Sequence, residues 1–381
     1  MRFPGFTDEW KKVTLGEIAS GFNYGLNAPA KDFDGENKYI RITDIDESTG
    51  SYLSNDIVSP NGTLTEEYLV KDNDILLART GASTGKSYLY NPADGKLYFA
   101  GFLIRFNVSS ANPYFIYASL HTRDYWRWVS IMSARSGQPG INSQEYSSYS
   151  LHLPSHKEQE KIATLLQILD ERIATQNKII EDLKELKSAI IDKHFTGYNS
   201  NTRIGDYIFE VSVRNKNSYN FPVLSVNNRL GFITQSEQFG DRKIASEDTS
   251  NYKIIDNNDF AYNPARINVG SIARLTNFEC GIVSPMYTCF RCNDLILPEY
   301  FELFLESKYF QAEVGKRLEG SVRQCLSIEG IQAIHFDIIP LPQQIIFTEQ
   351  LRSIQSQLSS EVTISLLYQN QRKYLLTNMF I

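Results

Sequence analysis

The feature that most constrains this chain is an internal repeat with an offset of about 185–189 residues. Leu15–Ile18 recurs as Ile204–Tyr207, and residues 71–76 recur as residues 255–260. One such match would be chance, but an ordered series at a nearly constant offset indicates two halves built on one plan. We therefore predict an α+β fold with a pseudo-two-fold internal duplication.

Each half begins with a strand-rich stretch, roughly 1–153 and 200–339, that Gly, Asn and Asp residues interrupt at short intervals. A helical patch is expected at 113–133 in the first half and at 298–318 in the second. Each patch opens with a proline, which suits the first turn of a helix.

Each half then ends in a long helix. No Gly or Pro interrupts residues 156–195, and Gly197 is a plausible C-cap. About 38 helical residues would extend for about 57 Å. Apolar residues spaced by threes and fours predict a heptad seam. The predicted seam comprises Ile162, Leu166, Leu169, Ile173, Ile180, Leu183, Leu186 and Ile190, and, after Pro342, Phe347, Leu351, Ile354, Leu358, Val362 and Leu366.

Two such helices in one chain can bury their stripes against each other. We expect an antiparallel coiled coil that separates two similar globular domains. The expected boundaries are 1–155 for the first domain, 156–197 for the first spacer helix, 198–340 for the second domain and 341–381 for the second spacer helix. The alternative is two unrelated helices, each packed on its own domain, although helices this long would overhang a domain of that size.

The net charge of −6 argues against a protein that coats nucleic acid without sequence preference, because neutralised phosphates supply that affinity. It leaves room for clustered basic groups or for partners that supply the charge. Residues 1–10 lack the apolar run of a signal peptide, and no stretch approaches the ~20 apolar residues of a membrane span. These features predict a cytoplasmic protein without membrane association, whose four cysteines are thiols.

Three segments carry a family resemblance. The run Phe3-Pro4-Gly5-Phe6-Thr7-Asp8-Glu9-Trp10 with Leu15-Gly16-Glu17, the run 74–86 (DILLARTGASTGK) and the run 154–162 (PSHKEQEKI) together resemble the specificity subunits of type I restriction–modification enzymes. The resemblance covers essentially the whole chain, including the duplication. The second half departs from the pattern at 263–270 and 341–345.

The resemblance implies two target-recognition domains, each reading one half of a bipartite, asymmetric site on double-stranded DNA, with the helices fixing the spacing. It also implies that DNA methyltransferase subunits dock on this scaffold and that a restriction/translocase subunit joins them. The chain would then be non-catalytic and hold no cofactor, whereas S-adenosylmethionine, ATP and magnesium would bind the partner subunits. The alternative is a coiled-coil adaptor whose two domains bind proteins.

Arg, Asn and Gln side chains, together with other polar and cationic ones, are the candidate DNA contacts, because Arg reads guanine, Asn and Gln read adenine, and polar and cationic side chains anchor phosphates. Residues 79–86 are expected to form a flexible loop, and the alternative is a plain hairpin turn. The candidates are Asn23, Tyr24, Lys38, Arg41, Arg79, Thr80, Ser83, Thr84, Lys86, Arg135, Gln138 and Asn142 in the first half, and Arg214, Lys216, Asn228, Arg229, Arg266, Asn268, Arg274, Arg323 and Gln324 in the second.

Enzyme and metal motifs are incomplete. Gly81–Ser87 has three residues where a phosphate-binding P-loop needs four, and its Gly-x-Ser-x-Gly is followed by an expected strand rather than the helix of a nucleophile elbow. Asn263-Pro264 is only a fragment of an adenine-methyltransferase motif. Cys289 and Cys292 have zinc spacing, but in an expected strand their side chains point to opposite faces. No catalytic residue and no metal site is therefore predicted.

Overall fold

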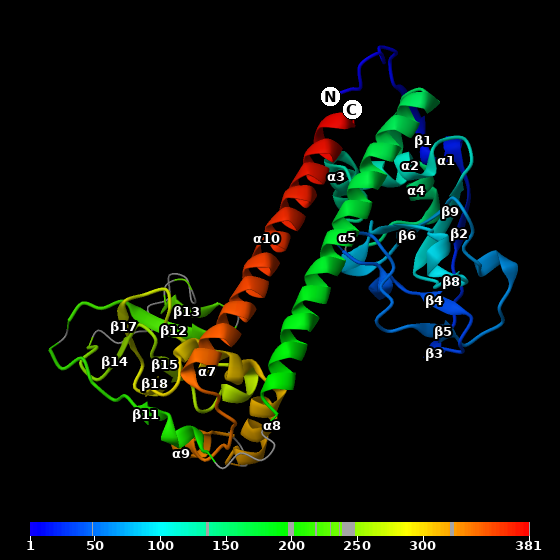
Figure 1. Ribbon diagram of the computed structural model, residues 1–381. Helices are drawn as coiled ribbons and strands as arrows, with labels where there is room; N and C mark the ends of the chain where they lie inside the picture. Colours follow the sequence, from blue (N-terminus) through cyan, green and yellow to red (C-terminus); the bar gives the residue numbers. More distant parts are fainter. Residues whose placement is uncertain are drawn as a thin grey trace. The chain divides into compact units, whose positions relative to one another are not determined.

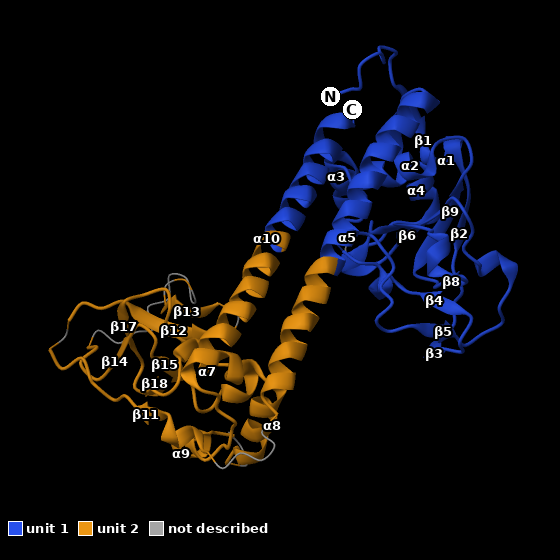
Figure 2. Cartoon of the chain, in the orientation of Figure 1, with its two compact units in different colours: residues 1–178, 362–381 blue, residues 179–361 orange. Residues whose placement is uncertain are grey.

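The computed structural model describes residues 1–47, 49–134, 137–196, 202–217, 219–228, 230–235, 237, 248–320 and 324–380 (Figure 1). The chain divides into two compact units (Figure 2). Unit 1 comprises Met1–Lys178 and Val362–Ile381, and unit 2 comprises Ile179–Glu361. Each unit thus contains a segment of both long helices, α5 (His156–His194) and α10 (Leu341–Met379).

Unit 1 is built on a four-stranded antiparallel sheet in the order β2-β9-β6-β7. Three strand pairs accompany it: β1 with β10, β3 with β5, and the parallel pair of β4 with β8. The strands are β1 (Lys11–Thr14), β2 (Ala19–Tyr24), β3 (Ala30–Asp32), β4 (Lys38–Ile40), β5 (Val58–Pro60), β6 (Asp74–Ala78), β7 (Ser87–Leu89), β8 (Leu97–Phe99), β9 (Leu103–Val108) and β10 (Ser150–Leu153). Short helices connect them: α1 (Leu15–Ile18), α2 (Pro113–Ser119), α3 (Arg123–Met132) and α4 (Ser143–Ser147).

Unit 2 contains two four-stranded sheets, in the orders β11-β18-β15-β16 and β13-β12-β17-β14. Its strands are β11 (Ile208–Glu210), β12 (Val223–Asn227), β13 (Gly231–Thr234), β14 (Lys253–Asp256), β15 (Phe260–Tyr262), β16 (Ile272–Arg274), β17 (Cys280–Val283) and β18 (Thr288–Cys292). Its short helices are α7 (Pro298–Glu306), α8 (Lys308–Arg317) and α9 (Ile328–Gln332).

Each predicted helical patch is two helices rather than one. Thr122 lies between α2 and α3 and is the N-cap residue of α3. Its Oγ1 accepts a hydrogen bond from the Tyr125 amide. Ser307 does the same between α7 and α8, where its Oγ accepts from the Phe310 amide. The capping side chain offers the backbone an alternative to continued helix, so the chain turns at both places.

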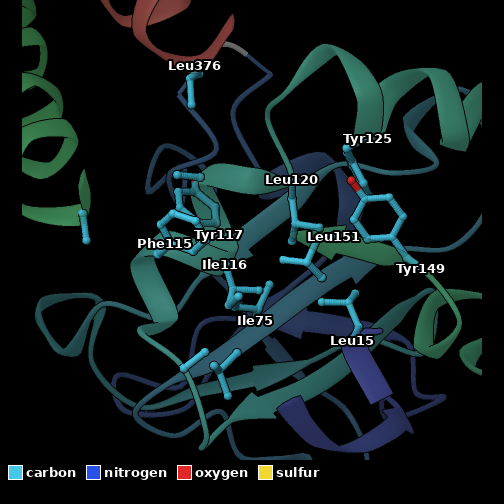
Figure 3. Packing of buried hydrophobic residues seen from close by; sticks show 14 of the residues in the cluster. Leu15, Ile75, Phe115, Ile116, Tyr117, Leu120, Tyr125, Tyr149, Leu151 and Leu376 are labelled. Atoms are coloured by element: carbon cyan, nitrogen blue, oxygen red, sulfur yellow. The ribbon is translucent and has the colours of Figure 1, made fainter. Parts of the chain in front are cut away.

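The core of unit 1 joins the sheet to α2 and to both long helices (Figure 3). Buried Ile75 of β6, Phe115 and Ile116 of α2 and Leu376 of α10 belong to one cluster. Ile162, Leu166, Leu169 and Ile173 of α5, the first four predicted seam residues, are buried in the same cluster.

Polar pairs complete the helix seam of unit 1. Arg372 Nε donates to Asp170 Oδ1 at 2.5 Å, and Ser365 Oγ donates to Asn177 Oδ1 at 2.9 Å. Asp170 and Asn177 follow each other along α5, whereas their partners Arg372 and Ser365 occur in the reverse order along α10, so the two segments are antiparallel. Val362 and Leu366 were wrongly predicted to lie in the seam, and both are exposed. Beyond Leu358, the polar residues Ser365 and Arg372 of α10 contact α5 instead.

The helix segments of unit 2 also pair antiparallel. Lys187 Nζ donates to Gln355 Oε1 at 3.2 Å, and the Phe195 and Phe347 rings meet at 5.9 Å. The predicted seam residues Ile180, Leu351 and Leu358 are buried, and Leu183, Ile190, Phe347 and Ile354 are partly buried. Leu186 was wrongly predicted and is exposed, because Lys187 takes the position that faces α10. Gly197 lies outside the described residues.

The two units repeat several local features. Asn73 and Asn258 both precede a strand with positive φ, at 67° and 70°. Gln159 Oε1 accepts the Asn112 amide and Gln344 Oε1 accepts the Leu297 amide, each at 2.9 Å, so one buried glutamine in each long helix fixes the chain before α2 or α7. Within the described ranges, no helix combines the length and apolarity needed to cross a bilayer.

Candidate nucleic-acid interface

The loop after β6 in unit 1 is held in place rather than flexible as predicted. Its 3₁₀ turn at Gly81–Ser83 begins with Gly81 at a φ of +74°, a conformation that favours glycine. The Gly81 amide donates to Pro139 O at 2.9 Å, and the Ile141 amide donates to Arg79 O at 3.0 Å. These bonds join the loop to the segment before α4.

Arg79 lies near two exposed aromatic side chains. Its guanidinium carbon is 4.9 Å from the Tyr24 ring centroid and 5.8 Å from that of Phe102. Arg79 Nε donates to Gly101 O at 3.0 Å. The side chains of Tyr24 and Phe102 are 43% and 59% exposed. Stacking plus one backbone bond fixes the guanidinium plane at the surface.

Two exposed amides extend this region. Asn23 is exposed next to Tyr24, and Gln138 is exposed with its Nε2 close to Gly81. The Ser143 amide donates to Tyr24 Oη at 3.2 Å, and hydrogen bonding by the Ser143 side chain, with its amide as a smaller cause, lowers the pKa of Tyr24. We call Asn23, Tyr24, Arg79, Phe102 and Gln138 the Arg79 surface. Its donors and acceptors are of the types that read base edges.

Thr80, Ser83 and Lys86 flank this surface and are partly buried. Lys86 Nζ lies 3.9 Å from Glu47 Oε2, so its charge is partly compensated.

Four candidates of unit 1 are corrected because their side chains serve the fold. Lys38 Nζ donates to Asp94 O, and Arg41 forms two 2.8 Å bonds to the Asp44 carboxylate. Thr84 is 5% exposed, and its hydroxyl donates to Gly81 O. Asn142 caps α4, with its Oδ1 accepting the Glu145 amide.

In unit 2, the exposed candidates are Arg214, Lys216, Asn228, Arg266, Asn268 and Gln324. The Leu326 amide donates to Pro264 O at 3.1 Å, so the loop after β15 is joined to the segment before α9. Arg274 is corrected: its partly buried guanidinium pairs with Glu299 and Glu302, each at 2.9 Å. Arg135, Arg229 and Arg323 lie outside the described residues.

The enzyme-like motifs take non-enzymatic geometry. The Gly81–Ser83 turn leads into strand β7, so the helix of a nucleophile elbow is replaced by a strand. Cys289 packs in one core cluster of unit 2 and Cys292 against another, on opposite faces of β18. Burial raises the pKa of both thiols to about 12. In the part of the chain that the structure describes, no three His, Cys, Asp or Glu side chains are grouped as a metal site.

Sequence reasoning missed Phe102 and Met286, which is 70% exposed. Both lie in the turn between two strands and just before the second one, Phe102 in the β8–β9 turn and Met286 in the β17–β18 turn. A large apolar side chain in a turn between two strand patterns was the available signal.

A family model described as the type I restriction modification DNA specificity domain matches residues 7–185. The chain is 24% identical over 192 residues to the type I restriction enzyme MjaVIII specificity subunit of Methanocaldococcus jannaschii. It is 25% identical over 204 residues to the type I restriction enzyme HindI specificity subunit of Haemophilus influenzae. Each match covers 50% of this chain and only 42% of the relative's length.

The solved structure of a type I restriction-modification system S subunit from M. genitalium has a similar fold, with a TM-score of 0.62 and 15% identity. The similarity covers 100% of this chain and 97% of that one, so it includes both units. This similarity confirms the predicted fold class. Residues 7–185 thus match a type I restriction modification DNA specificity domain, and the whole chain shares the fold of a solved S subunit.

Proposed function

We propose that this chain is the non-catalytic DNA sequence-specificity subunit of a type I restriction–modification complex. Each unit reads one half of a bipartite site on double-stranded DNA, and the long helices fix the separation of the halves. Methyltransferase subunits dock on the chain, and a restriction subunit joins them. S-adenosylmethionine, ATP and magnesium bind these partners.

The observation that carries the proposal is the match of residues 7–185 to a DNA specificity domain, because this stretch includes the whole Arg79 surface. That surface combines a stacked arginine, two exposed aromatic rings and two exposed amides. Stacked arginines and exposed amides are suited to hydrogen bonding with base edges. The same match favours DNA over protein partners for this unit.

The net charge of −6 bears on how binding is achieved. Affinity for duplex DNA depends on cations that neutralise phosphates. We therefore propose that the isolated chain binds DNA weakly and that the methyltransferase subunits supply much of the positive charge.

The test is to purify the chain alone and together with its methyltransferase subunit, and to measure binding to a random duplex library at fixed salt. The complex should select one bipartite sequence, and methylome sequencing of cells that express both should find methylation at the same sequence. The isolated chain should select poorly. A complex without sequence preference that captures a protein partner instead would support the adaptor alternative and contradict the proposal.

Non-catalytic function has its own test. Ser83→Ala removes the hydroxyl of the Gly-x-Ser-x-Gly motif, and the complex should keep its methylation pattern and rate. Loss of methylation with DNA binding intact would contradict a non-catalytic role.

A further inference from the structure

Resting on the proposed function, we infer that Arg79 reads a guanine in the half-site recognised by unit 1, and that Tyr24 and Phe102 hold its guanidinium in the reading position. Arg79 would then determine specificity at one base pair, while the remaining half-site is read elsewhere on the surface.

The first support is the geometry of the side chain. The two ring contacts and the Nε bond to Gly101 O restrain the position and the direction of the guanidinium. Among the described residues, nothing bonds to the two Nη atoms. Two parallel N–H donors on one edge match the O6 and N7 acceptors of guanine in the major groove.

The second support is the contrast with other arginines of the same unit. Arg2, Arg41 and Arg372 bond to carboxylates through their guanidinium groups. Arg79 instead pairs with ring faces, which hold the cation without occupying its Nη donors. A fixed guanidinium also loses less side-chain freedom on binding than an arginine that is free to rotate.

The third support comes from the matching place in unit 2. Ile75 pairs with Phe106 in the β6–β9 register, and Phe260 pairs with Phe290 in the β15–β18 register. Extending these registers places Pro264 at the position of Arg79.

The same alignment puts Met286 at the position of Phe102. Phosphate contacts do not depend on sequence and suit any half-site, whereas base contacts must differ between domains that read different sequences. Replacement of the arginine by proline and of the aromatic ring by a thioether therefore favours base reading over a shared phosphate contact.

The experiment uses the reconstituted complex of the full chain with its methyltransferase subunits. The bipartite site is first determined for the wild-type complex, and binding is then measured for all single base-pair changes in both half-sites. Arg79→Ala should reduce discrimination at one G·C pair of one half-site by about 10-fold or more. The other half-site should be discriminated as before.

Two further variants sharpen the test. Tyr24→Ala leaves Arg79 present but removes one of its stacking rings, so discrimination at the same base pair should weaken by a smaller factor. Arg127→Ala removes an exposed arginine of α3 in the same unit and serves as the matched control, with discrimination unchanged at every position.

The outcomes distinguish failure of the proposed function from failure of the inference about Arg79. If the wild-type complex selects no sequence, the proposed function fails. If it does, but Arg79→Ala weakens binding equally on all sequences and lowers the salt dependence by about one phosphate contact, Arg79 binds backbone and the inference is wrong. Unchanged discrimination at every base pair would overturn it as well.

Discussion

The helix pairs of the two units place different chemistry at matching positions. In unit 1, Arg372 of α10 bonds to Asp170 of α5, whose Oδ2 also accepts the Tyr114 hydroxyl at 2.5 Å. In unit 2, Lys187 of α5 bonds to the neutral Gln355 of α10 and pairs with Glu306 at 2.8 Å.

The carboxylate that pairs with the basic side chain therefore belongs to the other long helix in unit 1 (Asp170) and to the end of α7 in unit 2 (Glu306). Unit 1 uses a planar bidentate ion pair with little exposure, and unit 2 uses a flexible cation between an amide and a more exposed carboxylate. One helix arrangement is therefore fixed by a partly buried ion pair in unit 1 and by a weaker, more exposed one in unit 2.

The stability of each unit can be measured with its own probe, because all three tryptophans (Trp10, Trp126 and Trp128) belong to unit 1 and all four cysteines belong to unit 2. Tryptophan fluorescence in urea follows unit 1. Labelling of the buried Cys289 thiol follows unit 2.

The largest effect is expected for Arg372→Ala. Removing the guanidinium leaves Asp170 half-enclosed without its cation, which should lower the free energy of unfolding of unit 1 by about 3 kcal/mol. Fluorescence in urea would report it, with Cys289 labelling unchanged. A loss of less than about 0.5 kcal/mol is typical of an exposed ion pair, and would show that the Asp170–Arg372 pair is no more than a surface contact.

Next in size is an acid-sensitive contribution of His121 to unit 1. Burial, with the Arg372 charge as a second cause, lowers the pKa of His121 to about 4, against about 6.5 in an unfolded chain. The unfolded state therefore binds the proton first, so this stability is complete above pH 6.5 and is lost as pH falls toward 4. Comparing urea unfolding at pH 7.5 and 5, His121→Leu should flatten the difference by about 2 kcal/mol. Replacement of the exposed His156 by Gln should leave it as in the wild type; equal slopes in all three proteins would refute the assignment.

Removing one helix cap should lower the stability of the two units by a similar amount. Asn142 caps α4 and Ser327 caps α9, with its Oγ accepting the Gly330 amide at 3.1 Å. Asn142→Ala should cost unit 1 about 1 kcal/mol and Ser327→Ala should cost unit 2 about the same. Asn142→Asp and Ser327→Thr keep an acceptor and should restore most of the loss. Fluorescence and thiol labelling would detect the respective changes, and an effect confined to one unit would contradict the likeness.

The smallest effect is expected for Lys187→Met. The pair with Glu306 is partly exposed and the bond to Gln355 involves a neutral partner, so unit 2 should lose only about 0.5 kcal/mol. Cys289 labelling rates would measure it. A loss as large as that for Arg372→Ala would erase the proposed difference between the helix pairs.

The sequence predicted what depends on local periodicity. The residues from Ile162 to Ile173 that the spacing selects are buried, and the absence of Gly and Pro from 156–195 agrees with the 39-residue helix that forms. It failed where a polar residue occupies a seam position, as at Arg372, because a single sequence does not reveal the partner that compensates it.

The candidate site shows the same limit. Arg41, Arg79 and Arg274 were equal candidates by residue type, but two of them bond to carboxylates brought near by folding. Arg79 stands apart because the β2 end and the β8–β9 turn place aromatic rings on its guanidinium. Such pairings depend on tertiary contacts, which composition and spacing do not specify.

The division of the chain has a consequence for its synthesis on the ribosome. Unit 2 is one continuous stretch, Ile179–Glu361, so all of its core residues have been translated once residue 361 is added. Unit 1 must wait, although most of it is made first, because Leu375, Leu376 and Met379 belong to its core and Phe380 stacks on Phe115. The half that emerges first is therefore the half that finishes folding last.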